Sequence, residues 1–194
     1  MVRNNEGDDI RRGQKSVEVL SGKQYQKILG VVNNLRDKCL IELGFEHGSR
    51  QSEMGKYSVS GIDFEERKVK KWDTKKKEWR KVGISAQTAK DLEMYIQTAK
   101  VKDVLFPGRK PGTGITGKQC DNILKHWAEV IGIKEVITWH CLRRTLSSRA
   151  PALGLTIQDI MFITGDTERT INKYYQMPSP TDMGSKLDKA YEVV

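Results

Sequence analysis

Six consecutive residues in the last third of the chain combine positive charge with helical spacing: Trp139-His140-Cys141-Leu142-Arg143-Arg144. His140 and Arg143 are three residues apart, so on a helix they share one face. One side chain can donate a hydrogen bond to an oxygen of a phosphate while the other binds a second oxygen. For an isolated pair, the alternative is a partly buried histidine beside an ordinary arginine. Arg144 points elsewhere and suits a backbone contact or a salt bridge.

An upstream arginine and a downstream tyrosine pair extend this pattern. Arg50 follows a glycine and a serine at the expected start of a short helix, where backbone N–H groups favour an anion, and Glu53 could orient it. Tyr174-Tyr175 follow Gly165-Asp166. A tyrosine hydroxyl, with a pKa of about 10, can attack a phosphate when nearby cations stabilise the transition state. The alternatives are a surface arginine and tyrosines that only pack.

A lysine-rich segment lies between these regions: Trp72-Asp73-Thr74-Lys75-Lys76-Lys77-Glu78-Trp79-Arg80. Its flanks alternate like two strands of an antiparallel hairpin. Lys75, or second Lys76, could act at the tip as a general acid or as a cation on phosphate; the alternative is a solvated basic turn. The cations that we expect to contact a nucleic-acid backbone are Lys68, Lys70, Lys71, Lys76, Lys77, Arg80, Lys81 and Arg144.

Composition points to a polyanionic partner. The 194 residues carry 34 Lys+Arg against 25 Asp+Glu, a formal charge of +9, which favours nucleic acid; the alternative is a basic protein without such a partner. The three cysteines form no CxxC motif, so we expect a reducing compartment, no disulfide framework and no metal site. We find neither a membrane span nor a signal peptide. We therefore predict a cytoplasmic protein without cofactors.

The pattern of caps and breaks predicts a mainly helical α+β domain with a small antiparallel sheet. Residues 1–15 are polar and are expected to form a flexible arm; residues 16–178 form the domain, and residues 179–194 a C-terminal helix or tail. Helices are expected from Ser21, over 31–45, around Arg50, over 88–95 and 116–130, over 140–150, after Thr156, from Asp166-Thr167 through both tyrosines, and over 181–191.

Taken together, these motifs resemble the catalytic domain of the tyrosine recombinase (phage integrase) family. Gly48-Ser49-Arg50-Gln51-Ser52-Glu53 is similar to the family's G-x-R-x-S-E box, and His140-Cys141-Leu142-Arg143-Arg144-Thr145 to its H-x-L-R-[HR]-T box. Thr74-Lys75 followed by Trp79-Arg80-Lys81-Val82 is similar to its lysine hairpin. The residues of this hairpin are similar to those of archaeal and archaeal-virus members. Each box is weak alone, but their order and spacing agree with the family.

The resemblance implies strand cleavage and rejoining on double-stranded DNA through a 3′-phosphotyrosine link, without metal or ATP. Arg50, His140 and Arg143 would hold the phosphate, and Lys75 would protonate the leaving oxygen. The family's nucleophile lies nine residues after a His/Trp position, which selects Tyr175 over Tyr174. Members act as tetramers on paired sites, and the C-terminal segment would dock on a neighbouring protomer; the alternative is that it packs on its own domain.

Two departures from the family pattern stand out. Asp166 occupies the position where the family carries a hydrogen-bond donor. An aspartate there suits a helix N-cap, and the lost phosphate contact would pass to Thr167 or to a backbone N–H. The family also usually has a core-binding domain ahead of the catalytic one, which residues 1–15 are too few to form. The chain would thus be a fragment or a minimal member.

Three other functions remain open. A type IB topoisomerase uses nearly the same groups but relaxes supercoils as a monomer. A DNA-binding regulator could retain the fold without the chemistry, and Asp166 is the feature that favours it. A basic structural or RNA-associated protein would prefer RNA over duplex DNA.

Overall fold

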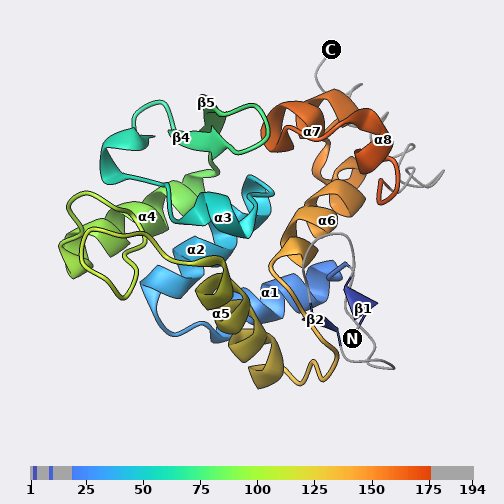
Figure 1. Cartoon of the computed structure of the whole chain (residues 1–194), viewed down its shortest axis with the longest axis horizontal. Coiled ribbons are helices and arrows are strands. Elements are labelled where there is room, and N and C mark those ends of the chain that lie inside the picture. The colour runs from blue at the N-terminus through green and yellow to red at the C-terminus, as the bar shows by residue number, and fades with distance from the viewer. Residues whose placement is uncertain (1, 4–8, 11–18, 176–194) are drawn as a thin grey trace, which may run out of the picture.

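The computed structural model describes residues 2–3, 9–10 and 19–175. The helices are α1 (Gly22–Val31), α2 (Leu35–Glu46), α3 (Gln51–Met54), α4 (Ala86–Ala99), α5 (Gly117–Val130), α6 (His140–Arg149), α7 (Ile157–Thr164) and α8 (Glu168–Ile171), with 3-10 turns η1 (Val59–Gly61) and η2 (Pro151–Leu153). The strands are β1 (Val2–Arg3), β2 (Asp9–Ile10), β3 (Ile62–Asp63), β4 (Lys68–Asp73) and β5 (Glu78–Gly83). The predicted mainly helical α+β class is confirmed (Figure 1).

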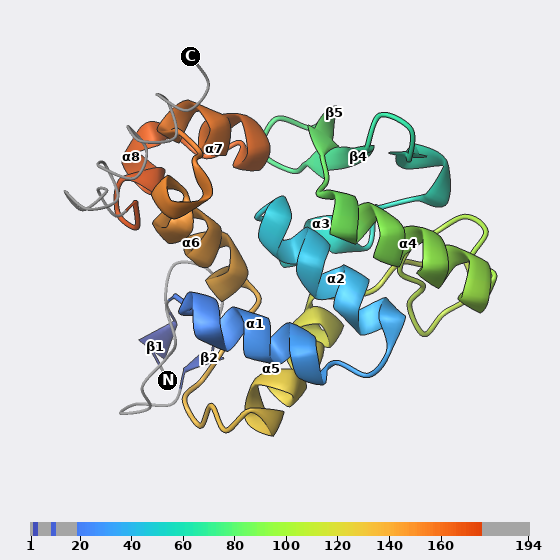
Figure 2. The ribbon, with the colours of Figure 1, turned by 180° about the vertical axis from the view of Figure 1, so that it is seen from behind.

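Helix α2 forms the centre of the core. Residues 39–45 are all buried, so α2 is covered on every side, and it contacts α3, α4, α5 and α6 (Figure 2). Gly44 lets Trp139 pack directly against α2, because a Cβ atom there would lie 2.3 Å from the ring of Trp139. Trp139 precedes α6 and donates from its ring Nε1 to the carbonyl of Ser49 (3.0 Å). The core thereby joins the start of α6 to the segment that carries Arg50.

The sheet is a three-stranded antiparallel unit in the order β3-β4-β5. The predicted hairpin is β4–β5, with Trp72 opposite Trp79 and Asp73 opposite Glu78. The sequence did not predict β3, which has only two residues, or the pairing of β1 with β2 inside the arm. In Figure 1 the β4–β5 turn reaches toward α7, so the tip of the hairpin lies beside that helix.

Helix starts followed their capping residues closely. Ser21 with Gln24 and Thr116 with Gln119 form the predicted capping boxes, and Ser85 and Thr156 cap α4 and α7. The prediction of a helix that starts at residue 31 was wrong, because α1 continues to Val31 and α2 starts at Leu35 after its N-cap Asn34.

The helix predicted to carry both tyrosines is shorter than expected. The helix expected to hold both tyrosines is only α8, which ends at Ile171, so Tyr174 and Tyr175 lie after it. The helix expected over 181–191 lies outside the described residues.

Within the described part of the chain, no helix has the length and apolar character needed to cross a membrane.

Candidate active site

Two arginines from different elements converge on one carboxylate. Arg50 lies at the start of α3 and Arg143 within α6. Arg50 Nη2 lies 3.2 Å from Asp166 Oδ1. Arg143 binds the same carboxylate in a bidentate manner, Nε to Oδ2 at 2.7 Å and Nη2 to Oδ1 at 2.6 Å. The arrangement is a cationic site of the kind that binds planar or tetrahedral anions.

The side chain of Asp166 differs from its sequence-based expectation. It is not the N-cap of α8, which is Thr167; its carboxylate turns to the arginines instead. Burial raises the pKa of Asp166, but the hydrogen bond and charge of Arg143, with the charges of Arg50 and His140, lower it overall. The carboxylate is thus ionised at neutral pH, and His140 lies near enough to act on it electrostatically.

Arg143 is held almost completely inside the protein, with a side chain only 3% exposed. Its Nη1 donates to the carbonyl of Gly48, and its Nη2 donates to the carbonyl of Thr164 at 3.0 Å. Because it binds the end of α2 and the end of α7 at once, it is a structural link as well as a cation.

Glu53 supports Arg50 from the inner side. Its buried carboxylate accepts from the backbone N–H of Arg50 (2.9 Å) and from Nη1 of the same residue (3.1 Å). The sequence-based proposal that Glu53 could orient Arg50 agrees with these contacts. Glu53 also lies 3.7 Å from Nζ of Lys71.

Lys71 lies inside the domain although we expected it to contact nucleic acid. Its Nζ donates to the carbonyls of His47 (2.7 Å) and Ile163 (3.1 Å), and its side chain is fully buried. Burial lowers the pKa of Lys71 to about 7, although the charge of Glu53 opposes that shift. Alternation along β4 could have indicated this position, because Lys71 and Asp73 share a face with the buried Val69.

Asp73 organises the hairpin turn. Its Oδ1 accepts from the backbone N–H groups of Lys75 (2.9 Å) and Lys76 (3.2 Å), and its Oδ2 pairs with Arg80 at 2.9 Å. Arg80 also donates to the carbonyl of Phe162 at 2.6 Å. The contacts of Arg80 are therefore made within the protein, whereas Lys75 and Lys76 are exposed to solvent.

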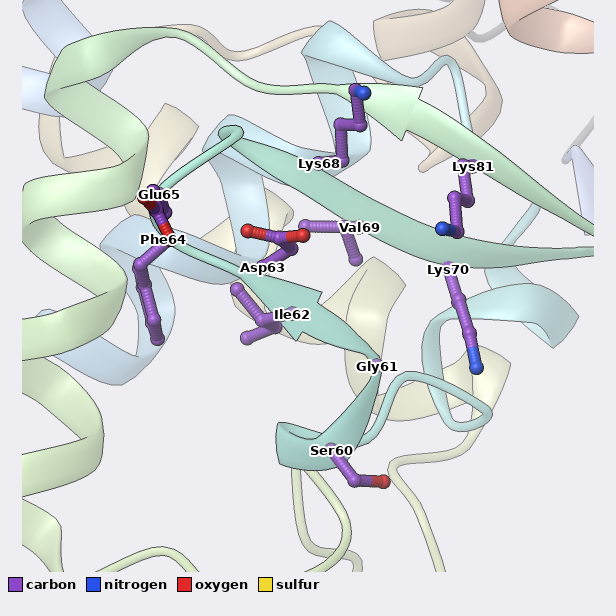
Figure 3. A pocket seen from close by; sticks show the side chains of 10 residues that line it. All are labelled: Ser60, Gly61, Ile62, Asp63, Phe64, Glu65, Lys68, Val69, Lys70 and Lys81. Carbon is purple, nitrogen blue, oxygen red and sulfur yellow. The ribbon is translucent and has the colours of Figure 1, made fainter.

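The outer face of the hairpin carries two of the predicted cations. Lys70 lies directly opposite Lys81, and both are exposed. Figure 3 shows these two residues beside a pocket of about 430 Å³ at the β3 side of the sheet, which none of the predicted catalytic residues lines. The exposed Trp79 contacts Trp72, and Lys56 covers the ring of Trp72 at 4.3 Å. Sequence reasoning missed this aromatic pair, although its cross-strand spacing was visible.

The two tyrosines occupy different surroundings. The hydroxyl of Tyr175 donates to the carbonyl of Leu155 at 3.4 Å, and its ring packs against the core. The ring of Tyr174 lies under the guanidinium of Arg144, 5.2 Å from its centre. The structure thus brings Arg50, Arg143 and Asp166 together, with His140 nearby, and holds the Tyr175 hydroxyl at the loop before α7.

Comparisons with known proteins identify the family of this chain. The model of the phage integrase family matches residues 18–179. Tyrosine recombinase XerA of Saccharolobus solfataricus is 28% identical over 181 residues, covering 93% of this chain and 58% of the relative. XerC of Thermodesulfovibrio yellowstonii is 28% identical over 149 residues, covering 72% of this chain and 49% of the relative. The chain therefore spans roughly half the length of these relatives.

Solved structures share the fold. The crystal structure of XerA recombinase superposes with a TM-score of 0.73 at 18% identity, covering 91% of this chain and 66% of the other. A lambda integrase dimer bound to a COC′ core site gives a TM-score of 0.65 at 15% identity, covering 86% of this chain and 49% of the other.

Proposed function

We propose that this chain, which belongs to the phage integrase family, cuts and rejoins DNA strands in site-specific recombination through a covalent link to Tyr175. The observation that carries the proposal is the convergence of Arg50 and Arg143 on one anion position. Two guanidinium groups at one point would neutralise the charge that develops on a phosphate under attack. The relatives named as tyrosine recombinases support the same chemistry.

In the proposed reaction the Tyr175 oxygen attacks phosphorus while the bond from phosphorus to the 5′ oxygen breaks. Lys75 gives a proton to that leaving oxygen, and the phenolic proton passes to solvent. The phosphotyrosine ester conserves the energy of the broken phosphodiester, so the reverse reaction reseals the strand without ATP. Because the hydroxyl of Tyr175 is engaged with the carbonyl of Leu155, we expect DNA binding to move this segment toward the arginines.

Double-stranded DNA is the proposed partner. The exposed pair Lys70 and Lys81 places like charges directly opposite each other, which is unfavourable unless an anion lies between or beside them. We propose that this face follows the phosphate backbone together with Lys76 and Lys77 at the tip of the hairpin and with Arg144. Lys71 and Arg80 are left out of this surface because their contacts are internal.

Assembly on DNA is also proposed rather than observed. Solved neighbours include a lambda integrase tetramer bound to a Holliday junction. By analogy we propose a tetramer on paired sites, with the chain monomeric in isolation. We also propose a cytoplasmic location, where the DNA of a cell without a nucleus is reachable.

The first test is covalent trapping on nicked DNA substrates in the absence of divalent metal. Wild type, Tyr175→Phe and Tyr174→Phe are compared on a denaturing gel, using a pool of sites. We expect an adduct that only Tyr175→Phe abolishes. Loss only in Tyr174→Phe would keep the chemistry and move the nucleophile by one residue.

A second candidate is a DNA-binding regulator with this fold and no cleavage. The internal acceptors of Arg143 and the hydrogen bond of the Tyr175 hydroxyl to the carbonyl of Leu155 favour it. DNA binding without an adduct from any variant would select this candidate. Relaxation of supercoils by a monomer, without exchange between sites, would instead indicate a topoisomerase.

A further inference from the structure

The carboxylate of Asp166 fills the position between the two arginines. It accepts hydrogen bonds from Arg50 on one side and from Nε of Arg143 on the other, and it forms an ion pair with Nη2 of Arg143. A guanidinium binds carboxylate and phosphate through the same two parallel N–H donors. An internal anion and an external phosphate would therefore need the same donors.

The donors of Arg143 show how complete this competition is. A guanidinium has five N–H donors. In Arg143, Nε donates to Asp166, Nη2 donates to Thr164 and Nη1 donates to Gly48, while Nη2 also forms an ion pair with Oδ1 of Asp166 at 2.6 Å. Asp166 thus occupies the edge formed by Nε and Nη2, so this edge cannot bind a phosphate in a bidentate manner while Asp166 stays in place.

The two carboxylates of the site differ in where they lie. Glu53 is fully buried and holds Arg50 from the inner side, while the Asp166 side chain is 14% exposed and lies on the outer side. Arg143, at 3%, lies beneath Asp166. A phosphate arriving from solvent would therefore meet Asp166 before it meets Arg143.

We propose that Asp166 is an internal anion that occupies the phosphate position of the free protein, and that a phosphate group binds only when this carboxylate leaves. Asp166 is then the residue that sets the affinity of the site for phosphate. The inference rests on the proposed function in taking that phosphate to be a DNA phosphodiester. Binding of inorganic phosphate tests the site itself, independently of cleavage.

The experiment is calorimetric titration of the full chain with inorganic phosphate at constant ionic strength. Wild type is compared with Asp166→Asn, which keeps the shape and removes the charge. The matched control is Glu66→Gln, which removes an equal charge from an exposed pair with Lys68. We expect Asp166→Asn to bind phosphate about tenfold more tightly, as when one adjacent competing charge is removed, and Glu66→Gln to bind like wild type.

A purely structural role for Asp166 predicts no gain in phosphate affinity in Asp166→Asn. Phosphate binding by folded Asp166→Asn that is no tighter than by wild type would overturn the proposal. If this variant does not fold, Asp166→Ser carries the same expectation. Wild type offers a further measurement, because saturating phosphate should shift the Nε–H resonance of Arg143, and an unmoved resonance would also overturn the proposal.

The outcomes separate this inference from the proposed function. Tighter phosphate binding by Asp166→Asn, with no covalent adduct from any variant, would support the role of Asp166 as an internal anion and contradict the proposed recombinase chemistry. An adduct from wild type, without a gain in the phosphate affinity of Asp166→Asn, would support the recombinase chemistry and contradict the role of Asp166 as an internal anion.

Discussion

The backbone N–H of Thr74 donates a hydrogen bond to Oε1 of Glu53 at 3.3 Å. The same oxygen accepts from Nη1 of Arg50 at 3.1 Å. One buried carboxylate therefore joins the first arginine of the site to the hairpin residue that precedes Lys75. Because the tip lysine is positioned through this contact, the arginine and the proposed proton donor are coupled.

Glu53→Gln should therefore impair both stability and cleavage. Removing one partner of a buried ionic cluster leaves Lys71 and Arg50 without their shared counter-ion, at a cost of about 3 kcal/mol in the free energy of unfolding. Urea denaturation measures the first effect, and the rate of adduct formation in a single turnover the second. The exposed Glu65→Gln is the control, and a Glu53→Gln variant that cleaves at the wild-type rate would contradict the coupling.

Lys75→Ala should slow cleavage by about a hundredfold to ten-thousandfold, the range for loss of a general acid, while DNA affinity changes little. Because a thiolate leaves without protonation more easily than an alkoxide, a substrate with sulfur at the 5′ bridging position should restore the rate. The neighbouring tip residue provides the control, Lys76→Ala. Equal losses on the oxygen and sulfur substrates would show that Lys75 is not the proton donor.

Glu42 should make the protein less stable at alkaline pH. Burial raises the pKa of Glu42 to about 8, with a further contribution from Asp91. Between about 4.3, the unfolded value, and about 8, the folded state holds an extra proton, so stability falls as pH rises through this window. Glu42→Gln should remove that decline, as measured by urea midpoints from pH 5 to pH 9. The exposed Glu93→Gln should keep it, and identical pH profiles for wild type and Glu42→Gln would contradict the assignment.

Gly165→Ala should destabilise the site more than a matched glycine change. Gly165 and Gly154 both have φ of +75°, but a Cβ atom at Gly165 would lie 2.4 Å from Oδ2 of Asp73, whereas nothing lies within 4 Å at Gly154. We expect about 1 kcal/mol for Gly154→Ala, the cost of the left-handed backbone, and about 3 kcal/mol for Gly165→Ala once the clash is added. Thermal unfolding of both variants measures this, and equal losses of stability would show that the hairpin can move away from the added Cβ atom at no cost.

Short-range patterns account for what could be predicted. Capping boxes such as Ser21 with Gln24 mark helix starts because the hydrogen bonds involved span three residues. The hairpin and the order of the motifs were readable for the same reason. The buried side of the hairpin could also be predicted, since Lys71 lies two residues after the buried Val69 and so shares its face, but the many neighbouring lysines favoured a solvent-exposed interpretation.

The sequence by itself determined the fold class, the family and the set of charged residues at the candidate site, because these depend on local spacing. Only the tertiary structure decided how those charges pair: Lys71 turns inward between α2 and α7, and Asp166 closes on Arg50 and Arg143 instead of capping α8. The physical reason is that a buried charge must find a partner, and its partners come from elements that are distant in sequence and meet only when the core packs.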